Sequence, residues 1–246
     1  MSKGVQPGEI RLELIPDDWK LTPLREKRPY LEGWTVNPCN KKDIERELAA
    51  GSCNGVGLIP GPQNNHLGLI WIDVDGLSAY DLIKEKSGLD PQEALPHTLT
   101  IRSGREGRER KLYKVSHELW PVLQRNKYKF VADVANEALE VLWGNSQGVL
   151  MGAHPDTAGF FTPPYEGFEW AEKLADLPEW ILKICRERDK KKGTRSEFTR
   201  MVGPGFAVNQ EIPLERRIQE ITEALWKVHA EKPEKVNIYD EWLGVG

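Results

Sequence analysis

The sequence predicts a mixed α/β (α+β) fold. Short apolar stretches with the length and composition of buried strands alternate along the chain with amphipathic segments of helical spacing, and turn residues separate them. Hydrophobic residues make up 39% of the 246 residues, which is enough for an ordinary buried core. The length suits one large domain, or one domain with an appendage.

The first elements lie before residue 77. Prolines and a basic cluster in residues 8–34 predict an extended, irregular but ordered segment with turns. Residues 40–50 place Ile44 and Leu48 on one face and are followed by Gly51, a pattern typical of a short helix. Two apolar runs, residues 55–61 and 67–76, are separated by a turn-rich linker and predict neighbouring buried strands.

The next elements are a helix and further strands. Residues 77–87 predict a helix that ends at Gly88, and alternation in residues 97–104 predicts a strand leading into a basic hairpin. We expect the return strand at residues 112–115 and weak structure at residues 120–127. Residues 130–135 fit strand and helix equally. Finally, residues 138–144 and 148–154 predict a strand pair joined by an Asn-Ser-Gln turn.

The C-terminal part predicts an appendage. Residues 174–188 have a helical pattern, and the basic run at 186–195 is typical of a solvated linker. A strong amphipathic helix is expected at residues 214–229. We therefore predict a domain at residues 1–185 and a basic linker with a helical appendage at 186–246. The apolar ending at residues 239–246 leads us to expect a longer natural polypeptide.

Overall charge and cysteine content exclude several classes. The 34 Lys and Arg residues face 38 Asp and Glu residues, so the chain is not uniformly basic and any nucleic-acid binding must be local. The three cysteines lie far apart without a CxxC pair, which fits neither a disulfide framework nor a zinc knuckle and suggests the reducing cytoplasm. No apolar stretch approaches the length of a membrane span, and no membrane partner is expected.

The strongest chemical signal is the sequence LIWIDVDG. Alternate side chains of a strand point to one face, so Asp73 and Asp75 project together while Ile72 and Val74 face the other way. Paired carboxylates repel each other unless a cation stabilises both ionised forms, and their hard oxygen atoms suit Mg²⁺ or Mn²⁺. The alternative is structural: both acids would cap the following helix.

A third acid, Glu140, lies inside the apolar run ALEVLW, where an unpaired carboxylate carries a large desolvation cost. If this strand lies beside that of Asp73, the three carboxylates can hold two metal ions that bind a triphosphate and polarise an attacking hydroxyl. Taken alone, Glu140 fits the solvent face of a half-exposed strand better. The combination with the two aspartates favours the metal site.

A basic hairpin lies between the acidic strands. Six cations oppose Glu106 and Glu109 there, and two glycines permit close approach of the backbone to phosphate; the cations are Arg102, Arg105, Arg108, Arg110, Lys111 and Lys114. The hairpin is a candidate clamp for a triphosphate or nucleic acid, although an exposed charged hairpin is the simpler interpretation. His154 is a candidate phosphate or base contact, and a surface or capping role is the alternative.

The order of these motifs resembles the primase-polymerase family of the archaeo-eukaryotic primase superfamily, as found in plasmid and phage replication proteins. The resemblance rests on KRPYLEGW, GVGLIPG, IDVDG, SGREGRERKLY and LEVLWGNSQGVLMGAHPDTAGFF, spread over most of residues 21–170. It implies an RRM-like antiparallel or mixed sheet that carries the acids and packs against a smaller α/β unit. It also implies that Asp73, Asp75 and Glu140 are catalytic metal ligands, and that Ser103 and residues near Lys111 contact the incoming nucleotide.

One position departs from the family pattern. The second motif of the family usually has a histidine two residues before an aromatic residue, and here Lys111 stands in that place before Tyr113. Lysine can neutralise phosphate as a point charge, so nucleotide binding survives the change in principle. The geometry of the contact must differ.

These observations favour a template-dependent primase-polymerase that uses NTP or dNTP and two Mg²⁺ or Mn²⁺ ions. The expected nucleotide-binding residues are Ser103, Gly104, Arg105, Arg108, Arg110, Lys111 and His154. Single-stranded DNA template and primer are the expected partners, with Lys27 and Arg28 on the nucleic acid and a helicase domain in the full-length chain. The rivals are a catalytically decayed single-stranded-DNA or origin-binding module and, ranked last, a DxD enzyme that uses a nucleotide-sugar.

Overall fold

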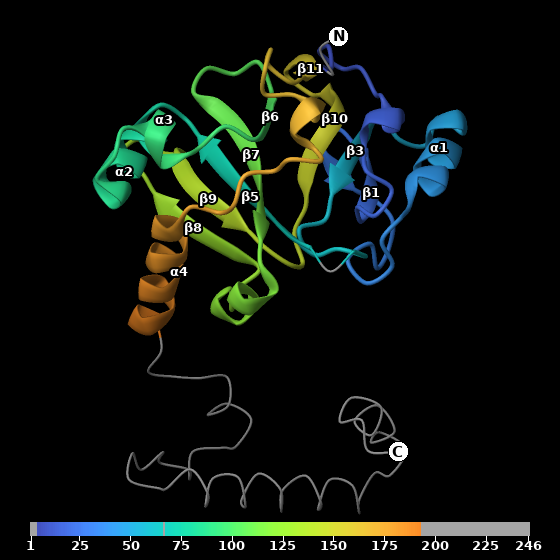
Figure 1. The fold of residues 1–246 in the computed structure, drawn as a ribbon. Coiled ribbons are helices and arrows are strands. Elements are labelled where there is room, and N and C mark those ends of the chain that lie inside the picture. Colours follow the sequence, from blue (N-terminus) through green and yellow to red (C-terminus); the bar gives the residue numbers. More distant parts are fainter. Residues whose placement is uncertain (1–3, 66, 193–246) are drawn as a thin grey trace, which may run out of the picture. The chain divides into compact units, whose positions relative to one another are not determined.

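The computed structural model describes residues 4–65 and 67–192, and it confirms the mixed α/β class. Two antiparallel sheets lie against each other, and helices cover the outer face of the larger sheet (Figure 1). None of the helices in this part of the chain is both long enough and apolar enough to cross a membrane.

The smaller sheet has five strands in the order β11-β10-β3-β1-β2. Its strands are β1 (Leu21–Arg25), β2 (Arg28–Pro29), β3 (Gly55–Leu58), β10 (Gly148–His154) and β11 (Thr157–Phe160). Helix α1 (Lys41–Ala49) precedes β3 and confirms the predicted short helix. It begins at a capping box, in which the Asn40 side chain accepts from the Asp43 N–H and the Asp43 carboxylate accepts from the Asn40 N–H.

The larger sheet has six strands, in the order β6-β7-β5-β9-β8 with the short β4 also paired to β5. Its strands are β4 (Gly61–Pro62), β5 (Gly68–Asp75), β6 (Leu99–Arg102), β7 (Arg108–Val115), β8 (Lys127–Val131) and β9 (Ala138–Leu142). The acidic strand β5 is therefore central, with β7 on one side and β9 on the other.

Helices α2 (Ser78–Ser87), α3 (Pro91–Ala94) and α4 (Glu179–Lys192) belong to the layer on the outer face of the larger sheet. Side chains of β5 that face this layer, Ile70, Ile72 and Val74, are completely buried with Ile83 of α2 and Ile181 of α4. Three short 3-10 helices complete the described structure, at Leu12–Leu14, His117–Val122 and Phe168–Trp170.

A second core lies between the sheets. Trp71 of β5, Leu112 of β7 and Leu142 of β9 pack there with Leu24 of β1 and Met151 of β10. Successive residues of β5 therefore alternate between the two cores, as a strand buried on both faces requires. Further along the same strand, Asp73 and Asp75 follow Trp71 on the face toward the smaller sheet, and the apolar contact gives way to charge.

Three predicted boundaries change. Strand β7 begins at Arg108, four positions before the expected return strand, so the arginines of the hairpin lie on a strand. Strand β8 forms at Lys127–Val131. It overlaps residues 120–127, for which we expected weak structure, and residues 130–135, which fitted strand and helix equally. Helix α4 runs from Glu179 to Lys192, so the helix predicted at residues 174–188 begins later and continues into the basic run. The domain boundary and the helix at 214–229 stay predictions, and that helix lies outside the described residues.

Candidate active site

Strand register brings the three predicted acids together. Asp73 of β5 lies directly opposite Glu140 of β9, so both side chains point to the same face, and Asp75 follows two residues later on that face. The condition set by the sequence, that the strand of Glu140 neighbours that of Asp73, is thus met. On the other side of β5, Arg110 lies opposite Asp73 and Arg108 opposite Asp75.

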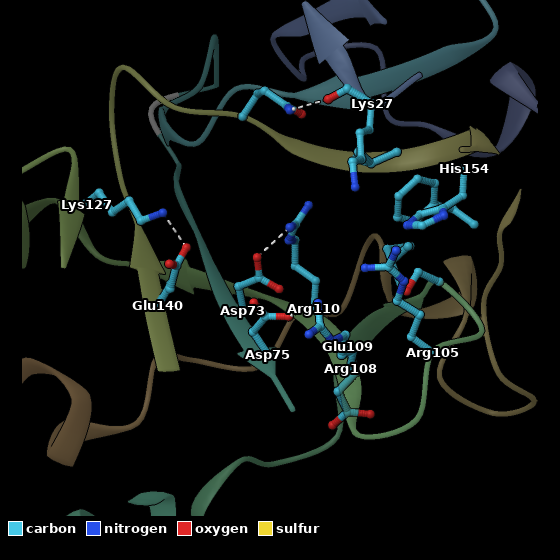
Figure 2. A pocket seen from close by; sticks show the side chains of 15 residues that line it. Lys27, Asp73, Asp75, Arg105, Arg108, Glu109, Arg110, Lys127, Glu140 and His154 are labelled. Carbon is cyan, nitrogen blue, oxygen red and sulfur yellow. Dashed lines mark hydrogen bonds and ion pairs between the residues drawn. The ribbon is translucent and has the colours of Figure 1, made fainter. Parts of the chain in front are cut away.

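The acids line a cleft of about 470 Å³ between the two sheets. The larger sheet contributes Asp73, Asp75, Glu140 and a set of cations, and the smaller sheet contributes Lys27, His154 and the apolar Val149 and Phe160 (Figure 2). Ser103 and Arg105, from the hairpin that joins β6 and β7, lie at its edge. Glu109 of β7 also lines the cleft, so five cations face four acids there; the cations are Lys27, Arg105, Arg108, Arg110 and Lys127.

Every one of the three acids is ion-paired. The Arg110 guanidinium lies 2.5 Å from Asp73 Oδ2, and the Arg108 guanidinium lies 2.7 Å from Asp75 Oδ1. Glu140 binds two lysines of the neighbouring strand β8, Lys127 through Oε2 and Lys129 through Oε1 at 3.1 Å. Dashed lines in Figure 2 mark the pair of Asp73 with Arg110 and that of Glu140 with Lys127. Cations of the chain itself therefore balance the negative charge of these three acids.

The surroundings move the pKa values of two acids in opposite directions. Burial raises the pKa of Asp75, and the neighbouring Asp73 and Glu140 add to this, while Arg108 counteracts it only in part. Burial also acts to raise the pKa of Glu140, but Lys127 and Lys129 outweigh it, so that pKa is lowered. A bound cation would therefore stabilise the ionised form of Asp75.

Lys27 reaches the cleft from a strained turn between β1 and β2. Glu26 and Lys27 both have left-handed backbone angles, with φ of 45° and 67°, which L-residues adopt at a cost. Two amide side chains hold the turn: the Glu26 N–H donates to Asn54 Oδ1 at 2.9 Å, and Gln147 Nε2 donates to the Lys27 carbonyl at 3.0 Å. The Lys27 side chain then points into the cleft (Figure 2).

His154, at the end of β10, is 8% exposed and lines the cleft. Its Nδ1 accepts the backbone N–H of Asp156 at 3.1 Å, which leaves the ring proton on Nε2. Burial lowers the pKa of His154, and the nearby Lys27 and Arg105 lower it further, so the ring is neutral at neutral pH. His154 can therefore offer one N–H donor to a ligand while its other nitrogen serves the local turn.

The hairpin between β6 and β7 meets the cleft at Ser103 and Arg105. Arg105 pairs with Asp156, which ties the hairpin to the smaller sheet. Gly104 lines a hollow on the far side of the hairpin instead of the cleft. At Gly107 a Cβ atom would lie 2.8 Å from the Leu77 nitrogen, and φ is +66°, so the close turn requires glycine.

Two predicted contacts lie elsewhere. Lys111 is opposite Ile72 on β5 and shares its face, away from the acids. Its Nζ lies 3.2 Å from Thr100 Oγ1 and 3.5 Å from a carboxylate oxygen of both Glu109 and Glu166. Lys111 therefore does not line the cleft, and its contact with the nucleotide stays a prediction that this placement does not favour; Arg110, one residue earlier on β7, lines the cleft instead. Arg28 is exposed on β2 and does not line the cleft.

Sequence reasoning missed three residues of the site: Lys127, Lys129 and Gln147. The segment KYKFV carried a signal, because lysines alternate with the aromatic residues Tyr128 and Phe130 as in a strand with one polar face. Gln147 had no such signal, since its role depends on the Lys27 turn, which is remote in sequence.

The donor set suits a hard divalent cation. Three carboxylates from adjacent strands share one face, and oxygen ligands of this kind are those that Mg²⁺ and Mn²⁺ prefer. Among residues 4–65 and 67–192, no three His, Cys, Asp or Glu side chains stand close enough together to form a ready-made metal site, since each of these acids turns to a cation. Metal binding here requires the acids to exchange partners.

The model of the family described as bifunctional DNA primase/polymerase, N-terminal, matches residues 11–180. The matched range contains every residue that lines the cleft. No curated protein matches the chain.

Proposed function

Because the chain belongs to the bifunctional DNA primase/polymerase family, we propose that it is a template-dependent primase-polymerase that transfers a nucleotide from NTP or dNTP to a growing strand. The family match gives the general class, nucleotidyl transfer in DNA replication. The finer proposal, that this chain itself is active, needs a site that can bind a triphosphate and assist an attacking hydroxyl group. We further propose that it acts in replication of a plasmid, phage or similar element, beside a helicase in the same polypeptide.

One observation carries the proposal: Asp73 and Glu140 are opposite residues of adjacent strands, with Asp75 beside them, on a face that opens into a cleft rich in cations. Buried charges of this kind are costly unless they are paired. A merely structural arrangement would bury them in the sheet, whereas here the acids line open space. Such a site suits a ligand that brings both positive and negative groups.

Asp73, Asp75 and Glu140 would hold the divalent cations, Mg²⁺ or Mn²⁺. Such ions, when bound, lower the pKa of an attacking hydroxyl and neutralise charge on the leaving pyrophosphate. Our proposed roles for the remaining residues concern the triphosphate. Arg108 and Arg110 can each form forked hydrogen bonds to phosphate oxygens, and Arg105 and Lys27 add charge from the hairpin and from the opposite sheet.

Ser103 and His154 supply neutral donors to the same ligand. The Ser103 side chain lies at the hairpin edge of the cleft, and the Nε2–H of His154 is free of the turn that occupies Nδ1. Gly104, next to Ser103, lines the hollow on the far side of the hairpin. Because it has no side chain, it would let the hairpin backbone come close to a phosphate. Arg28, exposed on β2 outside the cleft, is the proposed contact with the single-stranded template, while Lys27 moves from that role to the triphosphate.

Binding would proceed as an exchange of partners. The triphosphate competes with Asp73 and Asp75 for Arg110 and Arg108, and the divalent cations compete with the same arginines for the acids. Neither ligand alone replaces all the broken ion pairs, whereas both together do. We also propose that the larger sheet with its helices is the RRM-like unit, and that the smaller sheet with α1 is the second unit implied by the resemblance.

Incorporation of labelled nucleotide on a primed single-stranded template, with Mg²⁺ or Mn²⁺ and either nucleotide set, tests the proposal. We expect extension by the wild-type chain and none by Asp73→Ala. Asp176→Ala is the matched control, because Asp176 is also ion-paired, to Lys114, but lies outside the cleft. Retained extension by Asp73→Ala would remove Asp73 from the catalytic site and contradict the proposal.

The second candidate is a decayed module that binds single-stranded DNA or an origin without catalysis. The departure at Lys111 favours it, because the family usually has a histidine at this position, whereas here the position carries a lysine that does not line the cleft. It predicts salt-dependent DNA binding that survives loss of the acids, with no incorporation under any of the conditions above.

A further inference from the structure

We infer that Lys127 and Lys129, on the edge strand β8, bind backbone phosphates of the primer strand, so that its 3′ end reaches the acids from this side. The inference rests on the proposed function and adds to it the side from which the primer approaches the acids. Neither lysine belongs to the arginine-rich hairpin, and both contact the acid Glu140.

The charges of the cleft face follow the strand order of the larger sheet. Arg108 and Arg110 stand on β7, the acids on the central β5 and β9, and Lys127 and Lys129 on β8. We call the first group, together with Arg105, the arginine flank, and the two lysines the lysine flank. Lys129 lies directly opposite Glu140 and Lys127 lies two residues away on the same strand, opposite Leu142, so both side chains share the face of the acids.

The arginine flank suffices for one triphosphate. Such a ligand carries roughly four negative charges, which metal ions also help to neutralise. Arg105, Arg108 and Arg110, together with Lys27 across the cleft, already offer four cations. Guanidinium groups also match the paired oxygens of a phosphate, which suits a ligand held in one fixed position. The lysine flank is surplus to this ligand and is separated from it by the acids.

A nucleotidyl transfer has a second phosphate-bearing substrate, the strand that is extended. Its terminal hydroxyl must reach the acids from the side that the triphosphate leaves free. Lys127 and Lys129 satisfy this requirement, because a phosphate that replaces Glu140 as their partner lies next to that carboxylate. The template strand has no such need to approach the acids, which is why we assign the lysines to the primer.

The lysine flank is also open. Lys127 and Lys129 side chains are 48% and 50% exposed, and β8 is at the edge of the sheet, with Val131 of the same face exposed as well. Their strand neighbours Tyr128 and Phe130 pack on the helix side and fix the register of the lysines. Lysine is a flexible point charge without a fixed hydrogen-bond geometry, which suits a backbone that advances after each addition.

If Glu140 holds a metal ion, both lysines lose the carboxylate with which they pair in the described part of the chain. Two neighbouring cations beside an occupied metal site then attract phosphate. The charge complementarity points to a nucleic-acid backbone.

Fluorescence anisotropy with a labelled primer–template, in saturating non-hydrolysable dNTP and Mg²⁺, tests this assignment, because Glu140 is then expected to hold a metal ion and to release both lysines. We expect Lys127→Gln/Lys129→Gln to weaken primer–template binding roughly tenfold or more and to reduce the salt slope by about 2. Its affinity for a non-hydrolysable dNTP with Mg²⁺ should stay within about threefold of wild type, because the arginine flank is intact. Arg105→Gln/Arg108→Gln should show the opposite pattern.

Lys84→Gln/Lys86→Gln is the matched control, since these lysines are exposed, two residues apart and ion-paired, but lie on α2 over the opposite sheet face. Lys127→Arg/Lys129→Arg keeps the charge and should retain primer binding, which separates loss of charge from loss of folding. Primer–template binding by the Gln variant equal to that of the control would overturn the inference. Equal loss of binding to primer-free template would also overturn it, in favour of a template site.

The outcome is distinct from that of the proposed function. A wild-type chain that extends primers, combined with unchanged binding in the lysine variant, refutes only the lysine flank. A wild-type chain that extends no primer refutes the proposed function, whatever the binding data show.

Discussion

Arg110 and Lys111 are neighbours in sequence and lie on opposite faces of the larger sheet. Arg110 opens into the cleft and pairs with Asp73, while Lys111 is buried on the helix side among Thr100, Glu109 and Glu166. Both are cations beside carboxylates, so charge alone does not distinguish them. They differ in access: Arg110 lines the cleft, where a ligand can replace its partner, whereas Lys111 does not line the cleft and its side chain is only 7% exposed.

The comparison extends to the two faces as a whole. On the helix side, Lys111 contacts the carboxylates of Glu109 and Glu166, which Arg102 also contacts, Glu109 at 2.9 Å. On the cleft side, ion pairs connect residues that border open space. Buried clusters of the first kind stabilise or specify a fold, and open ones of the second kind can exchange partners. Substitutions on the two faces can separate these two roles.

The largest effect is expected from Lys111→Met. The Lys111 side chain is only 7% exposed, so its loss leaves Glu166 and Glu109 short of a cation and should lower the free energy of unfolding by about 3 kcal/mol. Urea denaturation measures this change. Nucleotide affinity of the folded protein should be unchanged; a specific loss of affinity with normal stability would place Lys111 in the functional site after all.

Arg110→Gln should show the reverse. Removing a charge-assisted contact to phosphate costs about 1.5–3 kcal/mol, so nucleotide affinity should fall roughly 10-fold to 100-fold. Stability should fall less than in Lys111→Met, because Asp73 borders an open cleft where water can reach it. Calorimetric titration with a non-hydrolysable dNTP and Mg²⁺ measures the affinity. A nucleotide affinity of Arg110→Gln equal to that of wild type would show that the cleft face and the helix face of the larger sheet do not differ in their access to the nucleotide.

Within the cleft, Glu140→Gln and Asp75→Asn should change stability in opposite directions, each on the order of 1 kcal/mol. The pKa of Glu140 is lowered, so its ionised form favours the folded state and the Gln variant is less stable at neutral pH. The pKa of Asp75 is raised, so ionisation opposes folding and the Asn variant is more stable. Thermal melts of both variants at pH 7 test this contrast.

The same shifts give a pH dependence with a definite sign. Stabilisation by Glu140 is present above its ordinary pKa of about 4.5 and is lost as pH falls through its lowered folded value. The cost of ionising Asp75 is present above its raised folded pKa and is absent below the ordinary value. The stability difference between Glu140→Gln and wild type should therefore shrink on acidification; a constant difference would contradict the pairing with Lys127 and Lys129.

The smallest effect concerns Gln147→Ala, which removes the hydrogen bond to the Lys27 carbonyl. We expect a reduction in nucleotide affinity of roughly threefold to tenfold, in line with about 1 kcal/mol for a neutral hydrogen bond. Adding Lys27→Ala should then cost less than it does in the wild type, because the turn is already displaced. Full additivity in this double-mutant cycle would show that Gln147 does not position Lys27.

Much of the fold and half of the site could be predicted from sequence because local patterns carried them. The alternation in LIWIDVDG fixed the faces of Asp73 and Asp75, and the apolar run around Glu140 identified its strand. The face of the sheet on which Lys111 lies could not be predicted. Only residues 112–115 were expected as strand, whereas β7 begins at Arg108, so Arg110 and Lys111 were not assigned to faces. In a strand, a shift of one residue moves every side chain to the other face.

Contacts between distant segments could not be predicted. Lys127 and Lys129 became site residues because β8 pairs with β9, and Gln147 because its loop meets the Lys27 turn. Single sequences carry no signal for such pairings. The ion pairing of the acids also depends on side-chain positions that arise only when β7, β5, β9 and β8 stand side by side.

The central claim is that Asp73, Asp75 and Glu140 form a metal site once a nucleotide occupies the cationic side of the cleft. Binding of Mn²⁺ tests this claim most directly. Electron paramagnetic resonance would follow Mn²⁺ titrated into the protein with a saturating non-hydrolysable dNTP, in wild type, Asp73→Asn/Glu140→Gln and the buried-face variant Lys111→Met. The account predicts nucleotide-dependent Mn²⁺ binding by wild type and Lys111→Met, and its loss in the double acid variant. Equal Mn²⁺ binding by the acid variant and wild type would contradict it.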